Sequence, residues 1–288
     1  MSNAVAGALD AAPLWVVGIG LLLSMAAAAT IGWWARLWIE ARAAEDAPGG
    51  ERSSGREAYI VSGVLGLLAL LLGFTFSLAI ERYEGRRALV LEEANDIGTT
   101  YLRAQILPSP YRERISDLLV VYTDNRIALG MEADTGERRE VLIRQNDQLL
   151  TDLWAETVAV MPGIRDAEFS GPFIKAMNAV IDMDTARKVA RGLHVPSEVF
   201  VLLLVYHIVS AGVLGFVLYG RHGVVLTGLL GLLFTLSLLL IMDIDSPTSG
   251  SVRESQRPML ILKASLASQP PRIFDRPAAG LSTDPGAF

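Results

Sequence analysis

The sequence predicts an all-α membrane protein with four transmembrane helices and a polar helical domain outside the bilayer. Of the 288 residues 51% are hydrophobic and none is cysteine, a composition typical of multi-pass membrane proteins rather than of a large soluble core. Four apolar runs are each long enough to cross a bilayer, which takes about 20 residues. The apolar residues of the polar region between the second and third runs recur with a helical period and show no useful strand alternation.

The first apolar run extends from Pro13 to Trp34 and ends in an aromatic and basic cluster typical of the membrane interface. Residues 1–12 contain no Lys or Arg, so the run is expected to be a transmembrane helix rather than a secretory signal. Residues 39–57 contain Pro-Gly-Gly and Ser-Ser-Gly and are expected to form a solvated connection.

The second run, residues 58–80, is expected to leave the membrane as one continuous helix. Residues 81–107 contain no proline and only single glycines, so nothing forces the helix to end at the membrane surface. An unbroken helix over residues 58–107 would be about 75 Å long. Its water-side half carries an apolar stripe at helical spacing, which predicts packing against other helices. The stripe consists of Tyr83, Val90, Ala94, Ile97 and Tyr101.

The remaining chain predicts three polar-region helices and two more spans. The periodicity indicates helices over about residues 110–130, 142–162 and 171–192. The third and fourth spans are residues 199–219 and 224–242. Because only four residues separate these spans, they are expected to form a tight antiparallel hairpin.

These elements predict five segments. They are an N-terminal segment (1–12), a first transmembrane pair (13–80), a cytosolic helical domain (81–198), a second transmembrane hairpin (199–242) and a cytosolic C-terminal tail (243–288). The tail is expected to contain another amphipathic turn or two and then, from Ala267, a loosely ordered end. Four spans place both termini and the polar domain on one side of the membrane. A modest excess of basic residues on that side favours the inner membrane with both termini cytoplasmic.

A motif in the second helix resembles the bestrophin family. It comprises Gly73-Phe74, Glu81-Arg82-Tyr83, Arg87 and Asn95-Asp96. Their order and spacing resemble the second helix of a bestrophin, and the long continuous form is similar to bacterial membrane proteins labelled bestrophin-like, which mostly have no assigned activity. The resemblance implies a ring oligomer, a pentamer, that conducts small inorganic anions such as chloride along an axis lined by this helix.

By position in that resemblance, the pore constriction would fall on Gly66, Leu70 and Phe74, and the pore entrance on Arg82 and Arg86. Leu70 and Phe74 are expected to gate by excluding water, whereas Gly66 lacks the bulk of a narrow neck. Apart from the resemblance, the small residues on this helix face are better interpreted as a packing seam. The arginines are better interpreted as head-group anchors or as ion-pair partners of nearby glutamates.

Four acidic or amide side chains and one histidine complete the candidates. Asn95 and Asp96 are expected to hold neighbouring cytosolic helices by hydrogen bonds. His207, the one ionisable side chain of the third span, is either a functional intramembrane group or a neutral interhelix contact. Asp243 and Asp245 follow the fourth span. Two carboxylates are too few for calcium, so a capping role is favoured.

The sequence also argues against several classes of function. It contains no phosphate-cradling loop, catalytic triad order or metal-ligand spacing, so no enzyme, cofactor or metal site is expected. Its formal charge of −6 argues against nucleic-acid binding. The expected partners are the lipid bilayer, further copies of the chain and small ions. The alternative function is a non-conducting membrane scaffold or sensor whose cytosolic helices bind a partner, and Gly66 favours it.

Overall fold

The computed structural model describes residues 13–46, 54–132, 136–218, 220–247 and 252–275, and all regular elements in these ranges are helical. The helices are α2 (Leu14–Asp46), α3 (Ser54–Ala104), α4 (Tyr111–Met131), α5 (Glu137–Ile164), α6 (Ser170–Gly192), α7 (Ser197–Val217), α8 (Gly220–Asp245) and α9 (Arg257–Ser268), followed by the 3₁₀ turn η1 (Pro271–Ile273). The predicted all-α fold is therefore confirmed.

The chain forms two compact units. Among the described residues, the transmembrane unit contains those up to Tyr83, His194–Ser246 and Val252, and the polar unit contains Glu84–Leu193, Pro247 and residues 253–275. Within the described residues four helices are long and apolar enough to span a membrane, and the apolar stretches lie in α2, α3, α7 and α8. This confirms the four predicted spans. Helix α2 continues to Asp46, so the connection expected from residue 39 begins in helical conformation.

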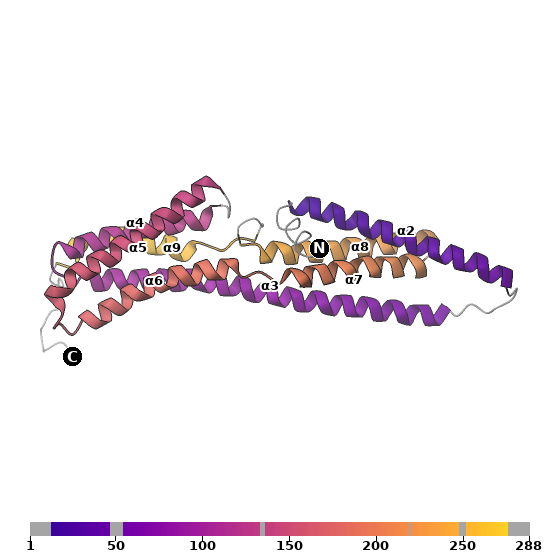
Figure 1. Ribbon diagram of the computed structural model, residues 1–288, viewed down its shortest axis with the longest axis horizontal. Helices are drawn as coiled ribbons and strands as arrows, with labels where there is room; N and C mark the ends of the chain where they lie inside the picture. Colours follow the sequence, from indigo (N-terminus) through magenta and orange to yellow (C-terminus); the bar gives the residue numbers. More distant parts are fainter. Residues whose placement is uncertain (1–12, 47–53, 133–135, 219, 248–251, 276–288) are drawn as a thin grey trace, which may run out of the picture. The chain divides into compact units, whose positions relative to one another are not determined.

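The transmembrane unit is held together most closely where α2 lies along α7 (Figure 1). A Cβ atom on Gly32 would collide with the carbonyl of Gly212, and one on Gly215 would collide with the carbonyl of Ala29. Because glycine has no side chain, the two backbones approach closely, as is common between helices in lipid. Elsewhere in this unit Leu68 is completely buried in an apolar core.

Helix α3 is a single uninterrupted helix of 51 residues (Figure 1), about 76 Å long at 1.5 Å per residue. The prediction of one continuous helix is therefore confirmed, with its end at Ala104 rather than at residue 107. A turn in which the amide of Leu107 donates to the carbonyl of Ala104 follows, before Pro108. The helix contributes residues up to Tyr83 to one unit and residues from Glu84 to the other.

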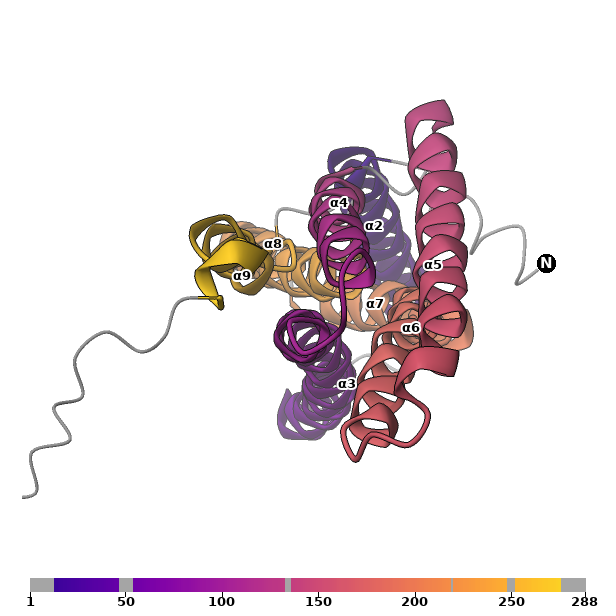
Figure 2. The ribbon, with the colours of Figure 1, turned by 90° about the vertical axis from the view of Figure 1, so that its left-hand side faces the viewer.

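In the polar unit, α4 lies between α5 and α9 (Figure 2). Tyr122 of α4, Phe173 of α6 and Met259 of α9 are fully buried in its core. The stripe predicted on α3 also enters this core, with Val90 and Ile97 completely buried. The three helices predicted between residues 110 and 192 are all present as α4, α5 and α6.

The C-terminal region is more ordered than expected. Helix α9 buries Met259, Leu262 and Leu266 against the polar unit. Beyond it, the Tyr101 hydroxyl donates a hydrogen bond of 2.8 Å to the carbonyl of Gln269. The prediction of a loosely ordered chain from Ala267 is therefore wrong as far as residue 275, because tertiary contacts hold this segment. Ser249 and residues 276–288 lie outside the described residues.

Candidate functional site

The predicted pore face of α3 is the face that the rest of the described chain leaves uncovered. Leu70 and Phe74 are 53% and 63% exposed, and Gly66 is also exposed. On the same helix Leu68 and Leu72 are buried. A shift of two residues rotates the side-chain direction by about 200°, so the buried stripe and the predicted pore stripe lie on opposite faces of α3.

The glycines of this α3 face make no close contact within the described chain. A Cβ atom added at Gly63, Gly66 or Gly73 would meet no atom within 4 Å. This differs from Gly32 and Gly215, where the packing of α2 on α7 leaves no room for a side chain. The small residues of α3 therefore do not pack against another helix of the described chain. This face of α3 is free to contact lipid or other copies of the chain, or to line a pore.

The two arginines predicted at a pore entrance have different surroundings. The side chain of Arg82 is half-buried. Arg86 is 3% exposed and forms an ion pair in which its Nε lies 2.9 Å from Oε1 of Glu254. Arg87 is exposed and pairs with Glu84 at 3.4 Å, as expected for residues three apart on a helix. The entrance role of Arg82 and Arg86 stays a prediction, and Arg86 already has a buried partner.

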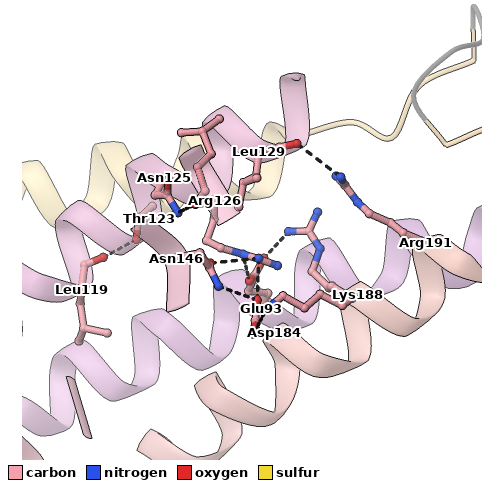
Figure 3. Close-up of polar contacts among 12 residues, drawn as sticks. Glu93, Leu119, Thr123, Asn125, Arg126, Leu129, Asn146, Asp184, Lys188 and Arg191 are labelled. Carbon is pink, nitrogen blue, oxygen red and sulfur yellow. Dashed lines mark hydrogen bonds and ion pairs between the residues drawn. The ribbon is translucent and has the colours of Figure 1, made fainter. Parts of the chain in front are cut away.

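A network of buried charges in the polar unit was not foreseen from the sequence (Figure 3). Glu93 of α3 is completely buried. Its Oε1 accepts a 2.6 Å hydrogen bond from Nε of Arg126, and its Oε2 accepts one from Arg187. Arg126 also donates to Oδ1 of Asp184 at 2.9 Å. One carboxylate of α3 therefore binds two guanidinium groups, one from α4 and one from α6.

Amide and lysine side chains complete the same network. Asn146 of α5 donates to Oδ1 of Asp184 at 3.0 Å and accepts from Arg126 at 3.3 Å. At the solvent edge, Nζ of Lys188 lies 2.8 Å from a carboxylate oxygen of Asp184 and 2.8 Å from one of Asp147. The hydrogen bond from Lys188 lowers the pKa of Asp147 below its ordinary value. Four helices thus share one set of charge-assisted hydrogen bonds.

The segment before α9 extends this network. Residues 253–257 alternate between exposed and buried, which places Glu254 and Gln256 inside the polar unit. Glu254 joins the buried charges through its ion pair with Arg86 and a longer one, 4.0 Å, with Arg187. Gln256 fills the notch at Gly130, where a Cβ atom would collide with its side chain. The buried carboxylates and guanidinium groups balance in number, which is the condition for burying charge at tolerable cost.

The position of Glu93 could have been noticed in the sequence. It follows Val90 by three residues and precedes Ile97 by four, so it lies on the buried stripe rather than beside it. Its partners could not have been named, because Arg126 and Arg187 belong to other helices. A carboxylate on an apolar helix face indicates that a cationic side chain is buried beside it, but the sequence does not identify that side chain.

The motif pair Asn95 and Asp96 lies at the edge of the polar unit. Asn95 is exposed and lines a groove of about 810 Å³ between α3 and α9. Asp96 is half-buried, and its backbone carbonyl accepts a 2.7 Å hydrogen bond from the Thr100 hydroxyl. Burial raises the pKa of the Asp96 carboxyl, and the neighbouring Glu92 and Glu93 raise it further. The predicted role of this pair in holding helices together stays a prediction.

His207 is completely buried where α7 meets α8. Its Nδ1 lies 2.7 Å from the carbonyl oxygen of Leu203 and its Nε2 3.3 Å from that of Phe234. The Phe234 ring meets the imidazole edge to face at 6.0 Å. Both ring nitrogens therefore face carbonyl oxygens, one on α7 itself and one on α8. The choice between a functional intramembrane group and an interhelix contact stays a prediction.

The two carboxylates after the fourth span bind backbone amides. Both carboxylate oxygens of Asp245 accept hydrogen bonds from the amide of Val195, at 3.0 and 3.1 Å. Asp243 accepts one from the amide of Val252 at 3.3 Å. Within the described ranges no group of three or more His, Asp or Glu residues is placed to hold a metal ion. Both carboxylates thus bind backbone amides of connecting segments, and the capping role stays a prediction.

These features define a class of protein: a multi-pass α-helical membrane protein whose second span runs unbroken into a polar helical unit. The family model for the Bestrophin-like domain matches residues 18–259. The chain therefore belongs to the bestrophin-like family, and the resemblance seen in the α3 motif is confirmed.

Solved structures show the same fold. A bacterial bestrophin homologue from Klebsiella pneumoniae with a tryptophan-to-alanine substitution superposes with a TM-score of 0.64 at 16% identity, over 89% of this chain and 98% of that chain. A tyrosine-to-alanine variant of that homologue gives a TM-score of 0.60 at 17% identity, over 87% and 97%. At such identities the likeness establishes the fold alone. A search of curated proteins found no match.

Proposed function

We propose that this protein is a homo-oligomeric channel of the inner membrane that conducts small inorganic anions passively, with a pore lined by the exposed face of α3. The observation that carries the proposal is the position of Leu70 and Phe74, which lie on the α3 face that the protomer does not use. Family membership supports it, because the motif around Phe74 resembles that of bestrophin channels. The polar unit and both termini lie in the cytosol in this proposal, in keeping with the excess of basic residues on that side.

In this channel, Leu70 and Phe74 form a hydrophobic constriction that conducts only when wetted. Gly66, one turn before Leu70, makes the narrow part short, since no side chain projects there. Arg82 would attract anions to the cytosolic end by raising the local positive potential. Ions cross this pore by passive permeation, and the proposal assigns no catalytic residue.

The proposal predicts that Phe74→Ala increases ion flux. Removing the ring widens the constriction and makes its wall less water-excluding, so flux of chloride into proteoliposomes should rise several-fold. Phe76→Ala is the matched control, because Phe76 is the same residue type at nearly the same depth but projects about 200° away and is 40% exposed. If Phe74→Ala and Phe76→Ala give the same chloride flux, Phe74 does not form the constriction.

A non-conducting scaffold or sensor is the second candidate function. Gly66 favours it, because a narrow pore neck requires a large side chain at this position, and the glycine leaves open space there. In this case the polar unit binds a partner and the spans only anchor it. Purified wild-type protein that passes neither chloride, sodium nor potassium in the same vesicles would favour the scaffold over the channel.

A further inference from the structure

The transmembrane unit contains a groove between α2, α7 and α8 that packing within the unit does not fill. Its volume is about 530 Å³, within the range of small-molecule sites between helices. Its lining is almost entirely apolar, and much of it consists of residues with small side chains or none. These are Ala26, Ala29, Ala211, Gly215, Gly228 and Gly231.

The groove has the length of one membrane leaflet. On α2 it extends from Leu22 to Trp33, and on α8 from Gly220 to Gly231, each about 16 Å at 1.5 Å per residue. The hydrocarbon core of a bilayer is about 30 Å thick. The deep end lies where Gly231 approaches the Met25 side chain, and the other end lies at the beginning of α8.

The mouth of the groove suits a phospholipid head group. Trp33 is there, and tryptophan prefers the boundary between acyl chains and head groups. The first turn of α8 carries Arg221 and His222 and no acidic residue, and both side chains are exposed. An anionic phosphate at this level would meet the exposed Arg221. The nearby Arg36 of α2 donates to the carbonyls of Phe216 and Val217 and is already paired with Glu40 at 2.9 Å.

One polar atom in the lining lacks a partner. The Oγ1 atom of Thr227 is buried, and no hydrogen-bond partner for it occurs in the described part of the chain. The Thr30 hydroxyl, by contrast, donates to the carbonyl of Ala27 at 2.7 Å. Buried hydroxyls are normally hydrogen-bonded, so Thr227 is available to a hydrogen-bonding group that enters the groove, such as the ester of a glycerolipid.

We propose that this groove is a binding site for one phospholipid, with an acyl chain between α2, α7 and α8 and the phosphate beside Arg221. The length of the groove, which equals one leaflet, and its apolar lining favour an acyl chain. The basic residue at its mouth favours a phosphate head group. The site uses only residues of the transmembrane unit and none of the proposed pore face, so it stands whether or not the protein conducts.

The first test is retention of lipid by the purified full-length protein in native mass spectrometry. Gly228→Leu should lower the fraction of protein carrying phospholipid several-fold, because the new side chain occupies the groove. Gly20→Leu is the matched control: a Cβ atom at Gly20 or Gly228 meets no atom within 4 Å, but Gly20 does not line the groove. If Gly228→Leu keeps as much phospholipid as wild type and Gly20→Leu, the proposal is overturned.

The second test needs no substitution. Wild-type protein is reconstituted in vesicles containing a trace of phospholipid with a photoactivatable group near the chain end, and labelled peptides are mapped. Labelling should be several-fold higher at Leu22, Met25 and Gly231 than at Leu229 and Leu233, which are exposed on α8 at the same depth but outside the groove. Uniform labelling of all exposed span faces would show ordinary lipid contact and would refute the site.

Discussion

At the scale of single residues, glycine has different surroundings on different helices of the transmembrane unit. Gly32 and Gly215 are glycines because any side chain would collide with a neighbouring backbone. Gly63, Gly66 and Gly73 are not required by packing inside the protomer, since their surroundings are open. The exposed Leu70 and Phe74 lie on this same uncovered face of α3, and they carry the functional proposal.

The buried charges give the clearest prediction at this scale. Glu93→Gln removes the charge that two buried guanidinium groups share, and breaking a buried pair costs about 3–5 kcal/mol. For a chain of this size the midpoint of thermal unfolding should fall by roughly 10 °C. The measurement is a circular-dichroism melt of the full chain in detergent.

The adjacent Glu92→Gln is the matched control, because Glu92 is exposed on the same helix. Its effect should stay within about 0.5 kcal/mol, as for most surface substitutions. Equal melting of the Glu92 and Glu93 variants would mean that the ion pairs of Glu93 with Arg126 and Arg187 do not hold the polar unit together.

At the scale of elements, α3 and α9 show how the polar unit is built. Helix α3 supplies both an apolar stripe and the central carboxylate of the charge network. The short helix α9 adds three apolar side chains to the same core, and the preceding segment inserts Glu254 and Gln256. The C-terminal region up to residue 275 is therefore part of the folded polar unit.

This role of α9 predicts a contrast between two leucines. Leu262 is 8% exposed and packs in the core, whereas Leu260 is 46% exposed. Leu262→Ala should destabilise the protein by about 2–5 kcal/mol through lost burial and a cavity. Leu260→Ala should cost under about 0.5 kcal/mol. Urea unfolding followed by circular dichroism measures both, and equal midpoints would argue that α9 is only loosely attached.

At the scale of the whole molecule, the proposed function depends on assembly. A single protomer offers only one copy of the α3 face, and several copies are needed to surround an axis. We therefore expect a ring oligomer, and the family resemblance predicts five copies. Light scattering coupled to size exclusion in detergent, corrected for bound detergent, should give five protomer masses. A monomer or dimer under these conditions would leave no central pore and would favour the scaffold.

Much of the fold was predictable from the sequence because its signals are local. The length of an apolar run predicts a span, and the absence of proline from residue 81 to 107 predicts that α3 continues. Helical periodicity predicted α4, α5 and α6 and the buried stripe with Val90 and Ile97. Each signal depends on neighbours within a few turns of one helix, so no knowledge of the other helices was needed.

The sequence by itself determined the number of spans, the continuity of α3 and the family motif around Phe74. Only the tertiary structure decided which charges are buried together, how α9 packs, and which face of α3 stays uncovered. The physical reason is that ion pairs and core contacts join residues far apart in the chain. Glu93 binds arginines of α4 and α6, and Arg86 binds Glu254, pairings that no local pattern specifies.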